Sequence, residues 1–422
     1  MKKTNITHLD LELYTEKLAN GLEIYIVPNT KINDVYVTYT TKYGSNIIDF
    51  KNNGKEYNVP YGIAHFLEHK MFEQKDGSSP FEEFDKLGAS ANAYTNNIQT
   101  TYLWSCPDNF EKNMKILLDY VNNPYFTDKN VEKEKGIIIE ELKMYEDSPF
   151  RNGIQKIKEN ALVNHPSRID VGGTIKSVKN ITKENLYDCY NAFYNPDNMF
   201  IVVTGNVEPN NVIKIIQKHF HKKNIKNKIE IKKYNEPLRV NCKKQTINMN
   251  VTIPKFLMGI KIDMNSYPLG KKEWYQYLSI YLDSLIGPTS KFNDELKNKK
   301  IITENFSFYL DEADNYILIT IAVESKCPTK LEKILKEEFK KKINEETFNR
   351  KKKCYLSSTI KLTDNIYGIN SLIMGEIIRY NKFNKDMYNQ IKNLNYNNFT
   401  KLIKHIDFNN TTILYIKPLK EK

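Results

Sequence analysis

Residues 61–72 read Tyr-Gly-Ile-Ala-His-Phe-Leu-Glu-His-Lys-Met-Phe, and the rest of the chain is organised around this stretch. On a helix, His65 and His69 project from one face because they lie four residues apart, and Glu68 shares that face because it follows His65 by three. Two imidazoles in this arrangement can bind one metal ion while a carboxylate stands beside it. The alternative is a chance match, in which both histidines are ordinary, partly buried side chains among apolar neighbours.

A second expected helix, residues 131–145, supplies carboxylates on one stripe. The residues that follow the i, i+3, i+4, i+7 spacing are Glu134, Ile137, Ile138, Glu141 and Tyr145. Because a buried carboxylate is costly unless it is paired or binds a metal, we expect Glu141 to be the third metal ligand. Glu134 would orient a ligating histidine from two turns away, and the alternative is that both acids pair with lysines. Glu140 points about 100° away and should be exposed.

Residues 89–95, Ala-Ser-Ala-Asn-Ala-Tyr-Thr, read as a strand that a short turn joins to a second strand over residues 100–106. Ala, Ser and Asn are poor strand formers, so this composition indicates close approach of another group. At the edge of a sheet such a strand could accept an extended peptide by strand addition. A plain hairpin is the alternative.

The composition is that of a globular protein with two or three domains, since the chain has 422 residues and is 40% hydrophobic. No apolar run reaches the roughly 18 residues that a membrane span needs, and the first ten residues lack the apolar core of a signal peptide. The five cysteines are odd in number and form no C-x-x-C. They are typical of reduced thiols, so we expect a cytoplasmic protein without a cysteine-based metal site.

The net charge of +12 raises the question of a nucleic-acid partner. The lysines are spread over the whole chain, however, and no nucleic-acid-binding motif surrounds them. We therefore expect a solvated basic surface and no nucleic-acid partner, although such a surface could favour acidic peptides.

The lysine- and asparagine-rich residues 221–238 predict a basic linker between a domain over residues 1–220, which holds the motifs above, and a second domain over residues 239–422. The second half repeats the expected order of helices and strands, and the repeat places Ser358 where Glu141 stands in the first half. His405 is the only histidine after the linker. The second half therefore cannot form the same site.

The spacing H-x-x-E-H is the inverted form of the zinc-protease pattern. Together with the other motifs it resembles the pitrilysin (insulinase) family of inverzincin metallopeptidases, which includes the mitochondrial processing peptidases, and most of all a bacterial subgroup sometimes called YmfH-like. The matching stretches run in family order through residues 12–215. They are the helix with His65 and His69, Gly88 to Thr95, Glu134 to Glu141, His165-Pro166 with Gly173-Thr174, Tyr194-Asn-Pro196, and Val203 to Val207.

The resemblance implies an α+β fold of two similar domains, each an antiparallel sheet with helices packed on one face, which together form half of a clam-like shell. It assigns one Zn²⁺ per chain to His65, His69 and Glu141, all in the first domain, which would be catalytic. The second domain would be non-catalytic.

The implied activity is that of a zinc-dependent endopeptidase acting on peptides or unfolded polypeptide segments. Glu68 would be the general base for a water activated by zinc, with Glu134 supporting the site. Substrate contacts are expected at Asn92 and Ala93 of the small-residue strand, and at Phe66, for which a core position is the alternative. The alternative for the whole chain is a non-catalytic or weakly active peptide-binding subunit of a heterodimeric processing complex, with a structural zinc.

One departure from the family bears on partners. Active members carry an Arg and a Tyr seven residues apart that hold the substrate carbonyl, whereas this chain has Lys297 and Glu304 in the corresponding stretch. We therefore expect a homodimer, or a heterodimer with a related zinc-free subunit that supplies the pair.

Overall fold

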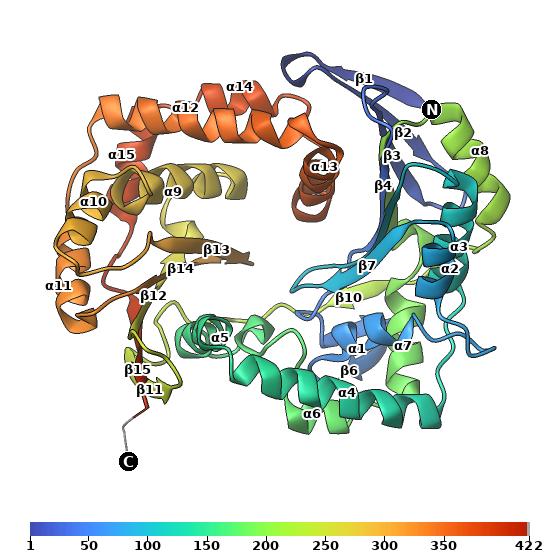
Figure 1. Ribbon diagram of the computed structural model, residues 1–422, viewed down its shortest axis with the longest axis horizontal. Coiled ribbons are helices and arrows are strands. Elements are labelled where there is room, and N and C mark those ends of the chain that lie inside the picture. Colours follow the sequence, from blue (N-terminus) through green and yellow to red (C-terminus); the bar gives the residue numbers. More distant parts are fainter. Residues whose placement is uncertain (420–422) are drawn as a thin grey trace. The chain divides into compact units, whose positions relative to one another are not determined.

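The computed structural model describes residues 1–419, which form two compact units (Figure 1). Unit 1 contains residues 1–142, 170–232 and 359–387, and unit 2 contains residues 143–169, 233–358 and the chain from 388 onward. Each unit is built on one main sheet covered by helices, and unit 1 has a second, smaller sheet. Within the described range, no helix combines the length and the apolar character that crossing a membrane requires.

Unit 1 is built on a seven-stranded sheet in the order β1-β2-β3-β9-β4-β8-β7. The bounds in that order are Lys2–Ile6, Leu11–Lys17, Glu23–Pro28, Met199–Gly205, Val35–Thr41, Thr100–Cys106 and Ser90–Thr95. A small sheet β10-β5-β6 joins Ile229–Ile231, Asp49–Asn52 and Lys55–Asn58. The helices are α1 (Ile63–Lys70), α2 (Pro80–Lys86), α3 (Phe110–Asn122), most of α4 (Asp128–Glu146), α6 (Ile175–Lys179), α7 (Lys183–Phe193), α8 (Pro209–His219) and α13 (Ile366–Tyr380).

Unit 2 is built on a five-stranded sheet in the order β11-β15-β12-β14-β13. The bounds in that order are Lys244–Met249, Thr411–Pro418, Lys255–Asp263, Tyr316–Glu324 and Ser307–Ala313. Its helices are α5 (Pro149–Ala161), α9 (Lys271–Ile286), α10 (Lys291–Asn298), α11 (Pro328–Glu338), most of α12 (Glu345–Lys361), nearly all of α14 (Met387–Lys392) and α15 (Tyr396–His405). Short 3-10 turns lie at Thr7–Leu9, Pro166–Arg168, Pro196–Asn198, Met264–Ser266 and Leu362–Asp364.

The two sheets repeat one topology. The order β3-β9-β4-β8-β7 of unit 1 matches β11-β15-β12-β14-β13 of unit 2, with a parallel first pair and antiparallel neighbours after it. The α+β class with two similar domains is therefore confirmed. The expectation of antiparallel sheets needs one correction, because β3 with β9 and β11 with β15 run parallel. Long helical segments precede β9 and β15, and only such a crossover lets a strand return in parallel.

Helices also pack on the second face of each sheet, which corrects the expectation of helices on one face. In unit 1, α13 from the second half of the sequence packs against β9 and β4. Its Ile369, Ile373 and Ile377 share a core cluster with Phe200 and Val202. In unit 2, α5 from the first half packs in the same way against β12, β14 and β15. The physical reason is that central strands such as β9, all seven residues of which are buried, are apolar on both faces and need two covers.

This exchange of α5 and α13 means that neither unit is continuous in sequence. The contacts group residues 143–169 with the second half of the chain, and residues 359–387 with the first half. The division into domains over residues 1–220 and 239–422, with a basic linker over residues 221–238, stays a prediction.

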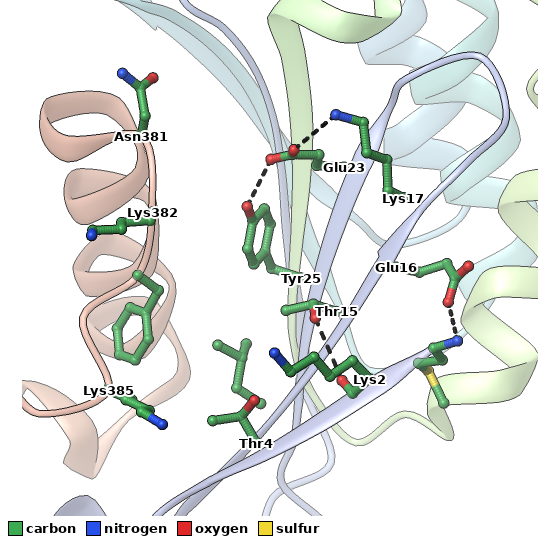
Figure 2. Close-up of a pocket in the computed structure, with 13 residues that line it drawn as sticks. Lys2, Thr4, Thr15, Glu16, Lys17, Glu23, Tyr25, Asn381, Lys382 and Lys385 are labelled. Atoms are coloured by element: carbon green, nitrogen blue, oxygen red, sulfur yellow. Dashed lines mark hydrogen bonds and ion pairs between the residues drawn. The ribbon is translucent and has the colours of Figure 1, made fainter.

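A pocket of about 730 Å³ lies in unit 1 beside the C-terminal end of α13 (Figure 2). Its lining includes residues of β1, β2 and β3 together with Asn381, Lys382, Phe383 and Lys385 just beyond the helix. Within it Glu23 accepts hydrogen bonds from Lys17 and Tyr25, at 3.3 and 2.8 Å. The residues that line it include none of the predicted site residues, so the pocket is separate from the predicted metal site.

Candidate metal centre

The helix α1 that carries the motif begins at a close contact between glycine backbones. Gly62, its N-cap, has a φ of 88°, and Gly173 has a φ of 85°, values that favour glycine. A Cβ on Gly62 would lie 2.3 Å from the carbonyl oxygen of Gly172, and one on Gly173 would lie 2.5 Å from that of Tyr61. Only glycine fits at these positions, so the loop over residues 170–174 fixes where the helix starts.

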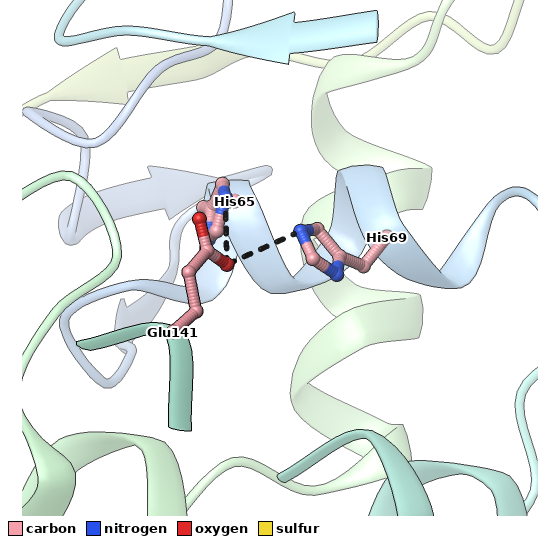
Figure 3. Close-up of side chains that lie close together, drawn as sticks. All are labelled: His65, His69 and Glu141. Carbon is pink, nitrogen blue, oxygen red and sulfur yellow. Dashed lines mark ion pairs between the residues drawn. The ribbon is translucent and has the colours of Figure 1, made fainter. Parts of the chain in front are cut away.

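The structure brings His65, His69 and Glu141 together (Figure 3). Each offers one ligand atom, and these atoms all lie within 4.8 Å of one another. Oε2 of Glu141 lies 3.9 Å from Nε2 of His65 and 3.7 Å from Nε2 of His69. Two imidazole nitrogens and one carboxylate oxygen therefore surround one small space, although Glu141 is 72 residues beyond His69 in the sequence.

These three side chains fit a zinc ion. Zinc binds imidazole nitrogen and carboxylate oxygen at about 2.0–2.2 Å in a tetrahedron, so two such ligand atoms stand about 3.3–3.5 Å apart. The separations of 3.7 and 3.9 Å are a few tenths of an ångström wider, which a small side-chain movement would close. The side chains are 15%, 26% and 20% exposed, in the order His65, His69, Glu141. That exposure leaves access for a fourth ligand, as catalytic zinc sites require.

Glu68 is buried beside the second histidine, with a relative exposure of 7%. Its Oε2 accepts a hydrogen bond of 2.6 Å from the hydroxyl of Thr95, the last residue of β7. Burial raises the pKa of Glu68, the Thr95 hydrogen bond and the charge of His69 act against that rise, and the charge of Glu141 adds to it. The pKa is raised overall, and a carboxyl group of this kind is suited to take up and return a proton.

Glu134 contacts Nδ1 of His69, whereas the other ring nitrogen, Nε2, lies near Glu141. Oε1 of Glu134 lies 3.0 Å from Nδ1 of His69, and its Oε2 lies 3.6 Å from Nζ of Lys70, whose side chain is fully buried. Burial alone would lower the pKa of His69, but the hydrogen bond and charge of Glu134, with the charges of Glu68 and Glu141, raise it overall. Burial alone would raise the pKa of Glu134, whereas its contacts with His69 and Lys70 lower it overall. The carboxylate therefore contacts both a histidine, as predicted, and a lysine, as the alternative proposed.

The stripe predicted on α4 is right for some residues and wrong for one. Ile138 is 1% exposed and Glu134 is 9% exposed, and Glu140 is exposed as predicted. Ile137, however, is 49% exposed and does not belong to the core. The buried line of the helix instead continues from Ile138 to Leu142, which is 7% exposed. Ile137 lies along one edge of this stripe, and the neighbouring elements cover the helix only along the other edge.

The expected substrate contacts divide into two groups. Asn92 is exposed and Ala93 is partly exposed on β7, which is the edge strand of its sheet as predicted. Phe66 is 0% exposed, which corrects its placement among the substrate contacts. It packs into the core with the other apolar residues of α1, Ile63, Ala64 and Leu67, which are also buried.

The stretch that departs from the family pattern uses its side chains locally within unit 2. Lys297 donates a hydrogen bond to Oδ1 of Asn305, and Oε1 of Glu304 accepts one of 3.2 Å from the backbone N–H of Glu324. Both side chains therefore have partners in their own unit.

Two site residues were not found from the sequence, namely Thr95 and Lys70. Thr95 reaches Glu68 across 27 residues, and no periodicity connects the two. Lys70 follows His69 directly and is the one charged side chain of α1 that is fully buried. The signal available was a lysine next to the motif with acids in reach, Glu73 three residues on and Glu134 on the second helix.

Comparison with families of known proteins agrees with the resemblance. The family model described as Insulinase (Peptidase family M16) matches residues 52–174, and that described as Peptidase M16 inactive domain matches residues 180–353. The first range contains every residue of the metal centre. The second covers the strand β9 and much of unit 2.

Two individual proteins are similar in sequence to this chain. The Bacillus subtilis (strain 168) protein described as uncharacterized zinc protease YmfH is 43% identical over 314 residues, which are 73% of each protein. The beta subunit of the mitochondrial-processing peptidase of Saccharomyces cerevisiae is 28% identical over 260 residues, 59% of this chain and 53% of that protein.

Two solved structures show the same fold. An M16-like peptidase from Alicyclobacillus acidocaldarius superposes with a TM-score of 0.91 at 29% identity, covering 97% of this chain and 99% of that one. The periplasmic protease PqqL from Escherichia coli shares the fold alone, with a TM-score of 0.73 at 18% identity, and this chain spans 49% of it. The chain belongs to the insulinase family of peptidases, peptidase family M16.

Proposed function

We propose that this protein is a zinc-dependent endopeptidase that hydrolyses peptides or unfolded polypeptide segments. The observation that carries the proposal is the convergence of His65, His69 and Glu141 beside the buried carboxylate of Glu68. A purely structural metal site needs no general base, so the position of Glu68 favours catalysis over a structural clamp.

The roles of the residues follow from their contacts. Zinc held by the two histidines and Glu141 would act as a Lewis acid on the scissile carbonyl and lower the pKa of a water molecule. Glu68 takes the proton of the attacking water and returns it to the leaving amine. Since Oε2 of Glu68 accepts the Thr95 hydrogen bond, its Oε1 is the atom available for that proton. Glu134 accepts from Nδ1 of His69 and so leaves the lone pair on Nε2, the atom that would bind zinc.

Substrate would bind as an added strand. One edge of β7 pairs with β8, and the other has no neighbour in the sheet order of the described chain. A peptide that adds there must be extended. We therefore expect unfolded segments to be cleaved in preference to folded proteins.

The second candidate is a peptide-binding subunit with little activity of its own. It is favoured by one observation, namely that Lys297 and Glu304 stand where active members have an Arg and a Tyr and bond within their own unit. A homodimer, or a heterodimer with a related zinc-free subunit, would then complete the site. All five cysteines are free thiols, which supports a reducing compartment such as the cytoplasm for either function.

The test combines zinc analysis with cleavage of a peptide library. Wild type purified without chelators should contain one zinc per chain and cleave the library, alone or mixed with a related zinc-free subunit. Glu68→Gln should keep its zinc and lose about 10²–10⁴-fold in rate, whereas Glu140→Gln, with an exposed acid on α4, should behave as wild type. Absence of zinc, or full activity of Glu68→Gln, would reject the proposal, and activity only in the mixture would favour the second candidate.

A further inference from the structure

We infer that Thr95 is a positioning residue, whose hydroxyl fixes the carboxylate of Glu68 relative to the strand on which the substrate lies. This inference rests on the proposed function and deepens it. The observation that supports it is the 2.6 Å hydrogen bond from Oγ1 of Thr95 to Oε2 of Glu68. Glu68 as a whole is only 7% exposed. Water has little access to that carboxylate, so the protein itself has to hold it in place.

The direction of this hydrogen bond follows from a count of protons. A threonine hydroxyl has one proton to donate, and an ionised carboxylate can only accept. The competing acceptor for Thr95 is the hydroxyl of Thr100, which is 3.2 Å away and neutral, and Thr100 donates its own proton to the carbonyl oxygen of Tyr43 at 3.0 Å. Hydrogen bonds to charged acceptors are the shorter and stronger ones. Thr95 therefore donates to Glu68.

Thr95 also belongs to the strand that would hold the substrate. It is the last residue of β7, opposite Thr100 on β8, and Ala93 and Asn92 lie two and three positions before it. A peptide added to the open edge of β7 would be hydrogen-bonded to the same strand whose last side chain is bonded to Glu68. The general base and the scissile bond would then both be positioned by β7. Their relative position matters because a misplacement of about 1 Å can cost on the order of 10²-fold in rate.

The alternative reading is that Thr95 has only a structural role, since a β-branched residue is favoured in a strand. The two readings differ in which atom matters. Valine keeps the shape and the β-branch of threonine but has no hydroxyl, whereas serine keeps the hydroxyl and loses the methyl group. Thr95→Val and Thr95→Ser therefore separate the readings.

The experiment measures kcat and KM on a cleaved peptide, zinc content and thermal unfolding for wild type, Thr95→Val, Thr95→Ser and Thr95→Ala. If Thr95 positions Glu68, then Thr95→Val and Thr95→Ala lose about 10-fold or more in kcat, with KM and zinc content close to wild type. Thr95→Ser should stay within about 3-fold of wild type. Thr100→Val is the control for a neighbouring hydroxyl, because it should lower stability without the same loss of kcat.

Three outcomes would overturn the inference: Thr95→Val as active as wild type, Thr95→Ser as impaired as Thr95→Val, or Thr100→Val with the same loss of kcat. If Thr95→Val does not fold, Thr95→Ala and Thr95→Ser decide in the same way. Crystal structures of the variants provide a readout that does not need activity. The Glu68 side chain should leave its position in Thr95→Val and keep it in Thr95→Ser. If wild type were inactive, the proposed function would be rejected, but these structures would still test whether Thr95 positions Glu68.

Discussion

Glu134 accepts a hydrogen bond from His69 although 65 residues separate them, with 3.0 Å between Oε1 and Nδ1. This contact fixes the ring orientation and leaves Nε2 to face Glu141, 3.7 Å away. Carboxylates placed in this way behind a metal-ligating histidine raise its basicity and restrict its tautomer. The pair therefore leads directly to a prediction about zinc affinity.

We expect Glu134→Ala to weaken zinc binding by about 10–100-fold, because His69 loses the group that orients it. Glu134→Gln should be affected less, since its amide oxygen can still accept from Nδ1. The measurement is competitive zinc titration against a chelating dye. Glu132→Gln is the matched control, because Glu132 lies on the same helix with a side chain that is 69% exposed. Equal zinc affinity of Glu134→Ala and wild type would contradict the role given to Glu134.

The glycine contact at the start of α1 leads to a second prediction. Gly62→Ala should destabilise the protein by about 2 kcal/mol or more, because a left-handed φ alone costs a side chain about 1–2 kcal/mol and the new Cβ would meet the Gly172 carbonyl. Zinc content should fall as well, since the helix that carries both histidines has to move. Gly54→Ala is the control, because Gly54 has a similar φ of 84° but nothing within 4 Å of a new Cβ. Equal stabilities of the two variants in chemical denaturation would show that the close contact is not the cause.

A buried ion pair in unit 2 gives a third prediction. Glu236 and Lys261 have side chains that are each 1% exposed and lie 2.6 Å apart. Glu236 also accepts backbone hydrogen bonds from residues 163–165, just after α5. Glu236→Ala should therefore cost about 3–5 kcal/mol in the free energy of unfolding. The charge of Lys261 is then left buried without a counter-charge, bonded only to the carbonyl oxygens of Ala161 and Pro237.

The control for this variant is Glu230→Ala, because Glu230 pairs with Lys228 at the surface and its side chain is 54% exposed. That change should stay within about 0.5 kcal/mol of wild type. Both free energies come from urea denaturation of the whole chain. A loss below about 1 kcal/mol for Glu236→Ala would mean that the pair is not what holds this region.

The fourth prediction concerns acid stability. Burial alone would raise the pKa of Glu332, but hydrogen bonds from Lys244, Lys336 and Tyr415 lower it from 4.5 to about 2. A carboxyl whose pKa is lowered by folding stabilises the folded state above its unfolded pKa, and this contribution is lost as the pH falls towards the folded pKa. The contribution of Glu332 is therefore complete above about pH 4.5 and disappears between about pH 4.5 and 2.

We expect Glu332→Gln to be less stable than wild type at pH 7 and to lose less stability between pH 5 and pH 2.5. The measurement is the free energy of unfolding at several values of pH. Glu337→Gln, on the same helix with a side chain that is 68% exposed, should follow the wild-type curve. Parallel curves for Glu332→Gln and wild type would refute the assignment of this acid-sensitive step to Glu332.

Much of the fold could be predicted because its signals are local. The motif helix and α4 have a helical period of apolar residues, and β9 is a short apolar run ended by Gly205. The repeat of the second half could be read for the same reason. The parallel strand pairs and the exchange of α5 and α13 could not, because the sequence of a helix does not state which sheet it will cover.

The candidate site shows the same division at the level of single residues. His65, Glu68 and His69 lie within one helical turn and a half, so their common face follows from helix geometry alone. The expectations that Ile137 belongs to the buried stripe and that Phe66 contacts substrate are wrong, since Ile137 is exposed and Phe66 is fully buried. A helical stripe defines which residues face the same way but not how far the neighbouring elements cover them.

The sequence by itself determined that two histidines and an acid share one face of a helix, that a second helix carries further acids at a matching spacing, and that the chain consists of two similar α+β halves. Only the tertiary structure decided that Glu141 stands within 4 Å of both histidines, that Glu134 lies behind His69, and that the hydroxyl of Thr95 reaches Glu68. The reason is physical: periodicity and turn residues act over a few neighbouring positions, whereas these contacts join residues that packing alone brings together.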